Sequence, residues 1–219
     1  MSIGRLRDFV CSMTRLVEAR GNAEQEILEP ARALMAELVQ RDDWLPDAFA
    51  APDPARYRQY LLYGDPLDRF SLVSFVWGPG QQTPVHDHLM WGLIGMLRGE
   101  EISVPYAIEN GQVIPGTPAH LKPGMVDAVS PHIGDIHTVS NALPDRPSIS
   151  IHLSHLQNSK PNMREIPSDV TTLDRICVIA PDFHPPRRRA AVFGRDGQMG
   201  SVLARRFTGK VSELPLKYR

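Results

Sequence analysis

The sequence predicts a mainly β protein: a small β-barrel of the jelly-roll type with helices at its N-terminus. Apolar residues recur at helical spacing in the first part of the chain, and from Arg69 onward they form short apolar or alternating runs typical of strands. Turn signals such as Gly-Pro, Asn-Gly and Pro-Gly separate these runs. Many short strands with such turns indicate a sandwich or barrel, and two spaced histidine motifs favour the jelly roll.

Three helices are expected before the barrel. A second helix runs through Leu34 and Leu38 with Pro30 as an early position, and a third, short helix is expected over Tyr57–Leu62. The first helix is predicted from its apolar residues at helical spacing, which are Leu6, Phe9, Val10, Met13, Leu16 and Val17.

Seven short runs are expected to form the strands of the barrel. Asn110-Gly111, between Ala107 and Val113, is a strong hairpin signal, because this dipeptide favours the two-residue turn that joins antiparallel strands. The seven runs are Phe70–Trp77, Trp91–Leu97, Glu101–Ala107, Gln112–Ile114, Met125–Val129, Ile136–Val139 and Ser148–Leu153.

These elements divide the chain into three segments. Residues 1–68 are a helical segment packed on the barrel, residues 69–156 are the barrel core, and residues 157–219 are an extension without apolar periodicity. We expect the extension to wrap the barrel or to mediate contact between the subunits of a homo-oligomer. Its run Pro185-Pro186-Arg187-Arg188-Arg189 is interpreted as a solvated loop rather than as an anion clamp.

Composition narrows the class of protein. A length of 219 residues suits one domain with an appended segment, and a net charge of -1 provides no basic field for nucleic acid. Cys11 and Cys177 are far apart and have apolar neighbours, which favours reduced thiols over a disulfide scaffold. We find no signal peptide and no apolar run of the ~20 residues that a membrane-spanning helix needs. A cytoplasmic protein with neither a membrane nor a nucleic acid as its partner is therefore expected.

Gly80, His86, His88 and Gly99 are spaced like the first metal-binding motif of the cupin superfamily, with one difference. In the common pattern a glutamate stands between the second histidine and the last glycine as the fourth metal ligand, and here Gly92 takes its place. Neighbouring side chains of a strand alternate, so the two histidines point the same way with ~6.6 Å between their backbones. Both imidazoles can therefore bind one ion.

Gly134, His137 and Asn141 have the offsets of the second cupin motif, and His137 is the third predicted ligand. Asp87 points away from its flanking histidines, so we expect it to make a structural contact or a hydrogen bond behind the ligands. The alternative is that the three histidines are unrelated. Four other histidines are interpreted as surface groups: His120, His132, His155 and His184. Of these, His132 is also an alternative candidate for a metal ligand.

Three neutral imidazoles leave a divalent ion its full charge of +2, whereas a carboxylate ligand neutralises part of it. Such a site favours anionic ligands, and about three positions stay open on an octahedral ion. A substrate can then bind through two atoms, such as a thiolate and a carboxylate or amine, with dioxygen beside it. Zinc, manganese or nickel can occupy the same ligands, so this argument permits thiol oxidation without requiring it.

The sequence between about Tyr57 and His152 resembles the bacterial branch of the cysteine dioxygenase-like thiol dioxygenases, including members that act on 3-mercaptopropionate. The resemblance implies that His86, His88 and His137 hold Fe(2+), and that both atoms of O2 are added to the sulfur of a small thiol to form a sulfinic acid. The segments that carry it are Trp77-Gly78-Pro79-Gly80, Thr83-Pro84-Val85-His86-Asp87-His88, Trp91-Gly92-Leu93-Ile94-Gly95, Gly134-Asp135-Ile136-His137 and Ser148-Ile149-Ser150-Ile151-His152.

The same resemblance assigns further site residues. Gln59 stands where cysteine-specific members have an arginine that binds the substrate carboxylate, and an exposed helix residue is the alternative interpretation. Ser150 and His152 share a strand face and match the start of a Ser-His-Tyr relay, whose tyrosine is replaced here by Ser154. The alternative interpretation of His152 is a core histidine that is bonded to Ser150. Gly92 falls where animal enzymes have a crosslinked cysteine, so that crosslink cannot form.

Our leading hypothesis from the sequence is an iron-dependent oxidoreductase, a dioxygenase of thiol oxidation in sulfur metabolism. Its substrate is a small carboxylate-bearing thiol: a 3-mercaptopropionate-like compound, cysteine or a larger thiol acid. Two alternatives remain. One is a cupin metalloenzyme of another type, performing specialised oxidative tailoring or acting as a Lewis-acid isomerase or lyase. The other is a cupin that binds a metal and an anion without catalysis.

Overall fold

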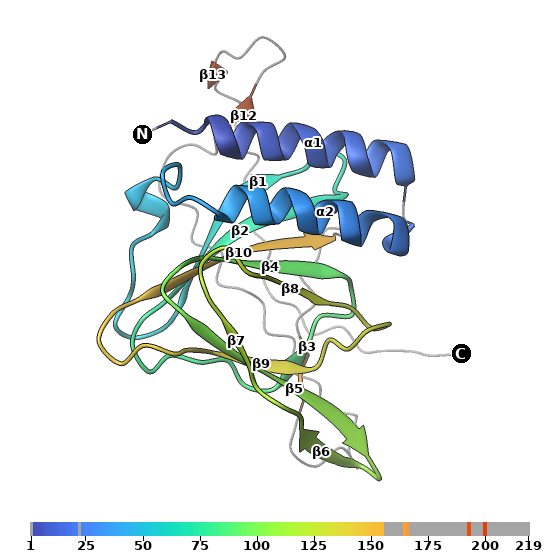
Figure 1. Ribbon diagram of the computed structural model, residues 1–219, viewed down its shortest axis with the longest axis vertical. Helices are drawn as coiled ribbons and strands as arrows, with labels where there is room; N and C mark the ends of the chain where they lie inside the picture. The colour runs from blue at the N-terminus through green and yellow to red at the C-terminus, as the bar shows by residue number, and fades with distance from the viewer. Residues whose placement is uncertain (1, 22, 156–163, 167–191, 194–198, 201–219) are drawn as a thin grey trace, which may run out of the picture.

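The computed structural model of the protein describes residues 2–21, 23–155, 164–166, 192–193 and 199–200. Within them, two antiparallel β-sheets face each other, and two α-helices lie across the outer face of one sheet (Figure 1). The predicted fold class, mainly β with N-terminal helices, is confirmed. Neither α-helix is long and apolar enough to cross a membrane. The helices are α1 (Gly4–Arg20), α2 (Glu24–Val39) and the short 3-10 helix η1 (Asp47–Phe49).

The first sheet has the strand order β1-β2-β10-β4-β8, so segments far apart in the sequence lie side by side. β10 is hydrogen-bonded to β2 on one edge and to β4 on the other. Such crossing connections are typical of a jelly roll and not of a simple meander. The strands of this sheet are β1 (Arg58–Gly64), β2 (Phe70–Trp77), β4 (Gly92–Arg98), β8 (Val126–Val129) and β10 (Ser148–His155).

The second sheet has the order β11-β3-β9-β5-β6, with β7 also paired to β5. The predicted hairpin joins β5 to β6, and both Asn110 and Gly111 have positive φ, 51° and 76°, as a tight hairpin turn requires. This hairpin extends beyond the rest of the sheet (Figure 1). The strands are β3 (His86–Asp87), β5 (Glu101–Glu109), β6 (Gln112–Pro115), β7 (Ala119–Leu121), β9 (His137–Asn141) and β11 (Arg164–Glu165); β12 (Val192–Phe193) and β13 (Met199–Gly200) form a separate pair.

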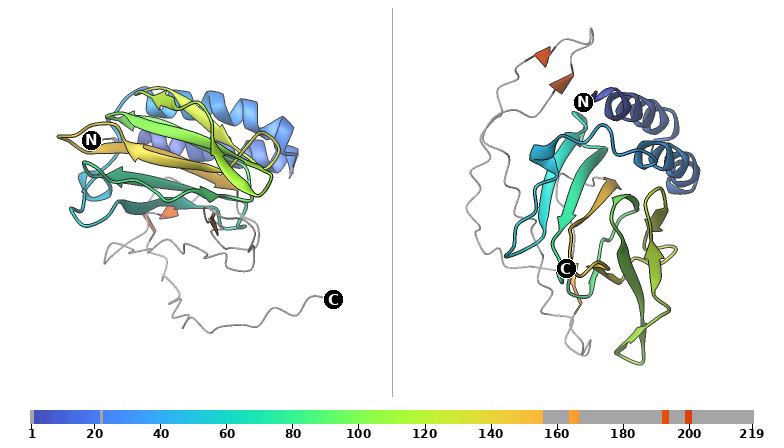
Figure 2. Two further views of the ribbon diagram at one scale, coloured as in Figure 1. Left: turned by 90° about the horizontal axis from the view of Figure 1, so that it is seen from below. Right: turned by 60° about the vertical axis from the view of Figure 1, so that its left-hand side comes forward.

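The central strands of the first sheet, β2, β4 and β10, are buried on both faces, and the two faces differ in chemistry. On β10, Ile149 and Ile151 point toward the helices and are fully buried in the main core, whereas Ser150 and His152 point between the sheets. Figure 2 shows the helices on one side of this sheet and the second sheet on the other. On β4, Gly95 lies so close to α2 that a Cβ atom there would be 2.8 Å from Met35. The helices therefore seal one face, and the other lines the space between the sheets.

Two local predictions for the N-terminal segment are wrong. The residues predicted as a third helix, Tyr57–Leu62, lie in and beside β1, which pairs antiparallel with β2. Tyr60 packs on the core under the helices, while Tyr57 stacks on aromatic side chains of β2. Long-range pairing therefore overrides the local helical pattern. Pro30 lies inside α2 and not near its start, because the helix already begins at Glu24.

Most of the extension predicted to wrap the barrel lies outside the described residues, including Cys177, His184 and the arginine run. One described piece, residues 164–166, lies at the edge of the second sheet. There β11 pairs with β3, and the backbone N–H of Ile166 donates to the carbonyl of Val85 (2.8 Å). One short part of the extension thus lies beside the first histidine motif. The proposed segment boundaries stay predictions.

Candidate metal centre

The three predicted ligands His86, His88 and His137 lie together between the sheets. His86 on β3 pairs directly with His137 on β9, and His88 follows two residues after His86. The Nε2 atom of His137 is 2.9 Å from Nε2 of His88 and 3.1 Å from Nε2 of His86. The three ligand atoms all lie within 4.8 Å of one another. Pairing between distant strands therefore assembles the cluster that two separate motifs predicted.

This donor set fits a metal ion. Two nitrogens in neighbouring positions around an octahedral ion, each about 2.1 Å from it, are about 3.0 Å apart, and the His88–His137 and His86–His137 Nε2 distances agree with that spacing. His86 Nδ1 lies 3.0 Å from the carbonyl oxygen of Pro84 and donates to it, so its Nε2 keeps a lone pair for a metal. The Nδ1 atom of His137 lies 3.4 Å from the Ser103 hydroxyl. Such contacts orient the rings of metal-binding histidines.

Burial keeps the three imidazoles neutral. It lowers the pKa of His86, although the hydrogen bond to the Pro84 carbonyl and nearby acidic groups oppose the shift. For His88 and His137 burial is again the main cause, and neighbouring imidazoles lower the pKa of each further, to well below the usual value. Neutral imidazoles are the form that binds a metal, so the site is ready for a cation at neutral pH.

Asp135 is a structural residue of the site that the sequence reasoning did not single out. Its carboxylate accepts from the backbone N–H groups of Leu89 (2.9 Å) and His88 (3.3 Å). Leu89 has a positive φ of 56°, so the chain turns sharply just after the second ligand. Asp135 thereby ties the end of one motif to the start of the other. Its place two residues before His137 was the available signal.

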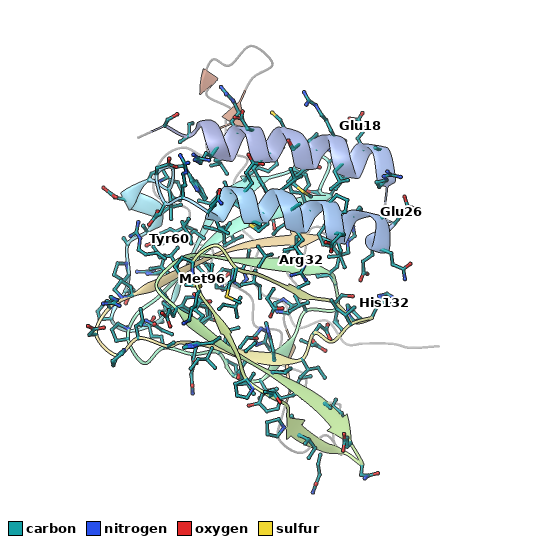
Figure 3. The ribbon with its side chains drawn as sticks, viewed as in Figure 1. Glu18, Glu26, Arg32, Tyr60, Met96 and His132 are labelled. Carbon is teal, nitrogen blue, oxygen red and sulfur yellow. The ribbon has the colours of Figure 1, made fainter. Side chains whose placement is uncertain are left out.

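The structure also shows where the other residues discussed from the sequence lie relative to the histidine cluster. Asp87 is buried in β3 and is not one of the clustered ligands. His132 is exposed beside the start of α2, where it contacts Glu24 (3.2 Å), so it is not a ligand of this cluster (Figure 3). His155 was expected on the surface, but it is buried at 7% exposure and stacks on Trp91. That prediction is wrong because β10 continues through His155 and pairs it with β2.

Aromatic and polar side chains from both sheets close around the cluster. The His152 ring stacks on Phe75 at 3.9 Å between centroids, and Tyr57 extends the stack over Phe75 and Trp77. The three histidines and these aromatic side chains line one small pocket. Its lining residues are Phe75, Trp77, Thr83, His86, His88, His137, Val139 and His152.

Ser150 and His152 share a face of β10, as predicted, and they are in direct contact. The Ser150 hydroxyl lies 3.0 Å from Nε2 of His152, and the indole N–H of Trp77 donates to the same hydroxyl at 3.2 Å. Burial, with a smaller effect of His86, lowers the pKa of His152 to about 3. His152 is therefore a neutral imidazole with one nitrogen held by Ser150.

Gln59 lies on β1 directly opposite Phe75, so its side chain points to the pocket side of the first sheet. It is half-buried. Gln59 is not an exposed helix residue, as the alternative interpretation required. It stands one strand away from the pocket wall and is not among the residues that line the pocket. Its role in substrate binding stays a prediction.

Gly92 on β4 is paired with Ser154 on β10. Ser154 lies on the same face of β10 as Ser150 and His152, two residues after His152. A Cβ atom at Gly92 would lie 3.2 Å from the carbonyl oxygen of Leu153 and 3.3 Å from a methyl of Val129. A larger side chain at this position would have to displace its neighbours. The place of the fourth cupin ligand is thus occupied by backbone and small side chains.

No family model matches the chain. Among solved structures, a protein with a double-stranded β-helix domain from Klebsiella pneumoniae is 22% identical over 53% of this chain and 90% of its own length, with a TM-score of 0.39. A cupin superfamily protein from Desulfitobacterium hafniense is 14% identical over 53% and 94%, with a TM-score of 0.40. A polyketide cyclase from Streptomyces resistomycificus is 21% identical over 49% and 68%, with a TM-score of 0.35.

Two facing antiparallel sheets, a strand order with crossing connections and a histidine cluster between the sheets describe a cupin-type jelly-roll barrel with a site that can bind a metal ion.

Proposed function

We propose that the protein is a non-haem iron thiol dioxygenase that acts on a small carboxylate-bearing thiol. The observation that carries this proposal is the convergence of three neutral histidines with no carboxylate in the described cluster. An ion held by such ligands keeps its full charge of +2, which favours binding of an anionic thiolate. Phe75 and Trp77 beside the cluster provide apolar surface against which the carbon chain of a thiol can pack.

The reaction is R–SH + O2 → R–SO2H. Both oxygen atoms form bonds to sulfur, which loses four electrons while O2 gains four, and the proton ends on the sulfinic acid. When bound, Fe(2+) supplies the activation of O2 and lowers the pKa of the substrate thiol. The chain's own residues hold the iron and keep bulk water away from the sulfur.

Ser150 and His152 are the proposed catalytic pair beside the metal ligands. Because the hydroxyl of Ser150 holds one nitrogen of His152, the ring is fixed in the pocket wall, and its other nitrogen can form a hydrogen bond with the substrate. No tyrosine follows at position 154, where Ser154 stands beside Gly92. Ser154 does not have the reach of a phenol, so the relay of this chain ends at His152.

Gln59 is the proposed contact for the substrate carboxylate. Its amide is uncharged and can donate to one carboxylate oxygen, so it orients the substrate more weakly than an arginine would. The position opposite Phe75, on the pocket side of β1, supports this assignment. A neutral contact also suits substrates without an amino group, such as 3-mercaptopropionate.

Oxygen uptake by the full-length protein, loaded with Fe(2+) under anaerobic conditions, tests the proposal. The panel contains 3-mercaptopropionate, cysteine, mercaptosuccinate and larger thiol acids, with cysteamine as the thiol without a carboxylate. We expect uptake with at least one thiol acid, a product that carries two 18O atoms from 18O2, and little turnover of cysteamine.

The matched controls are His88→Ala, which removes a ligand, and His120→Ala, which removes an exposed histidine outside the cluster. The first should abolish uptake, and the second should leave it unchanged. Full iron occupancy without uptake for any thiol would overturn the proposal. Formation of disulfide in place of sulfinate would do the same.

A further inference from the structure

Thr83 is a polar side chain in the wall of the metal pocket, and the proposed reaction does not use it. Its exposed fraction is 3%, and it lines the pocket together with the three clustered histidines. Phe75 and Val139 offer only carbon atoms to the same wall, and the indole N–H of Trp77 already donates to Ser150. Thr83 thus brings a hydroxyl group to a part of the wall that is otherwise apolar.

The oxygen of the Thr83 hydroxyl is held by the backbone of β9. The N–H of Val139 donates to Oγ1 of Thr83 at 2.9 Å, and the N–H of Thr83 donates to the carbonyl of Val139, also at 2.9 Å. The side-chain oxygen takes the place that a backbone carbonyl has in a regular antiparallel pair. Since both bonds are made to the backbone of a strand, the position of Oγ1 is fixed.

The hydrogen of this hydroxyl is not used within the part of the chain that the structure describes. A hydroxyl has one hydrogen to donate and two lone pairs to accept with. Val139 occupies one lone pair of Thr83, and no described residue accepts the hydrogen. Buried donors are nearly always paired. A buried hydroxyl with a hydrogen to donate, in the wall of a pocket, therefore indicates a contact that a bound ligand completes.

The position of Thr83 indicates which part of a ligand it can reach. Its partner Val139 follows His137 by two residues on β9, so the two side chains share a face and their backbones are ~6.6 Å apart. An atom bonded to the ion lies among the histidines, whereas a group two or three carbon atoms farther along the same molecule is within reach of Thr83. Phe75 and Trp77 provide apolar surface for those carbon atoms.

We infer that Thr83 is a specificity-determining residue that donates a hydrogen bond to the carboxylate of a metal-bound thiol acid. The identity of this ligand rests on the proposed function. A carboxylate oxygen is a strong acceptor, and a hydrogen bond to a charged group is stronger than one to a neutral group. Thr83 therefore selects thiols that carry a carboxylate at the far end of a short carbon chain. Gln59 remains the proposed partner of the other carboxylate oxygen.

The test compares 3-mercaptopropionate with 1-propanethiol, which has the same three-carbon chain without the carboxylate. Binding to the full-length protein with Co(2+) in the metal site is measured without O2, through the absorption change when a thiolate binds cobalt. We expect wild type to prefer 3-mercaptopropionate. Thr83→Val should bind 3-mercaptopropionate about 10- to 100-fold more weakly, with 1-propanethiol unchanged. Thr83→Ser keeps the hydroxyl and should bind both thiols like wild type.

A purely structural effect of the substitution gives a different result. In Thr83→Val the N–H of Val139 loses its acceptor, and a pocket distorted by this loss would bind both thiols more weakly by a similar factor. Thr138→Val is the matched control, because Thr138 lies on the opposite face of β9 and is not among the lining residues. It should bind both thiols like wild type.

A second readout needs no valine variant. In wild-type protein with 13C-labelled threonine and Zn(2+) in the metal site, the Cβ signal of Thr83, assigned by its loss in Thr83→Ser, should shift with 3-mercaptopropionate and not with 1-propanethiol. An equal response to the two thiols would contradict the contact.

The inference is overturned if Thr83→Val weakens both thiols equally or neither of them, or if wild type does not prefer 3-mercaptopropionate. Binding to the cobalt protein needs neither O2 nor turnover, so these outcomes are separate from those of the oxygen-uptake experiment. A protein that binds thiol acids through Thr83 but consumes no O2 would contradict the proposed dioxygenase and leave this contact intact.

Discussion

The two faces of β10 are buried to a similar extent, yet different interactions hold them. Ile149, Ile151 and Leu153 on the helix side are 0% exposed and depend on close apolar packing. On the inner side, Ser150 is 0% and His152 7% exposed, and both depend on hydrogen bonds and ring stacking. Burial of apolar groups stabilises the fold, whereas burial of polar groups is tolerated only with partners. The helix side, or outer face, of β10 therefore contributes most to the stability of the fold, and the polar groups of the inner face are available for chemistry.

Removing one of the metal-binding histidines should have the largest effect on the inner face. His86→Ala or His137→Ala should abolish stoichiometric metal binding, because the two nitrogens that remain cannot hold the ion on one face. Metal content after equilibrium dialysis measures this, and the exposed His120→Ala should bind like wild type. A His137→Ala protein with full metal content and activity would refute the ligand assignment.

Ile151→Ala tests the outer face. It removes a fully buried side chain from the main core, so it should lower the free energy of unfolding by about 2–5 kcal/mol. Urea denaturation measures the loss. The folded variant should still bind one metal per chain, since the ligands lie on the opposite side of the sheet. Loss of metal from folded Ile151→Ala would mean that the two faces are not separable.

The pH dependence of stability distinguishes buried imidazoles from the buried acid. In the metal-free protein, His86, His88, His137 and His152 have lowered pKa values, about 3 for His152, so the unfolded chain binds more protons below about pH 6.5. The contribution of these neutral imidazoles to the free energy of unfolding is complete above about pH 6.5 and is lost as the pH falls below it. Each imidazole adds a slope of at most about 1.4 kcal/mol per pH unit.

Glu101 acts in the opposite direction. Its folded pKa of about 8 lies above the ordinary value of 4.5, so its contribution is complete below pH 4.5 and is lost as the pH rises to about 8. The free energy of unfolding, measured in urea from pH 5 to 9, should therefore have a maximum near pH 7, where the protons bound by the unfolded imidazoles balance the one held by folded Glu101. In Glu101→Gln the decline above this maximum should be weaker; an unchanged decline would assign it to other groups.

Gln59→Ala should have the smallest effect. We expect the KM for a carboxylate-bearing thiol to rise about 3- to 10-fold, equivalent to one neutral hydrogen bond, with metal content unchanged. Steady-state oxygen uptake measures both parameters. An unchanged KM would mean that Gln59 does not contact the substrate. Only the residues that line the pocket would then remain as candidate substrate contacts on the inner face.

Much of the barrel and the whole histidine cluster could be predicted from local patterns. Short alternating runs identified β2, β5 and β10, and Asn110-Gly111 identified a hairpin, because side-chain alternation and turn conformation depend on neighbouring residues. The spacings around His86 and His137 predicted the ligands, since a metal site restricts residue type at definite offsets. Tyr57–Leu62 was assigned to a helix because its pairing with β2 leaves little trace in the local pattern.

Other features follow from contacts between strands that are distant in sequence. Asp135 reaches the turn after His88, and His155 is covered because β10 pairs with β2. In the sequence pattern Glu101 is an ordinary charged residue at the start of a strand, yet in the structure it is a buried acid at 1% exposure that accepts from the Ser148 hydroxyl of β10. Amino-acid type and spacing determine which groups can bind a metal. Burial, and with it the pKa and hydrogen-bond partners of each group, depends on the packing of the two sheets against each other.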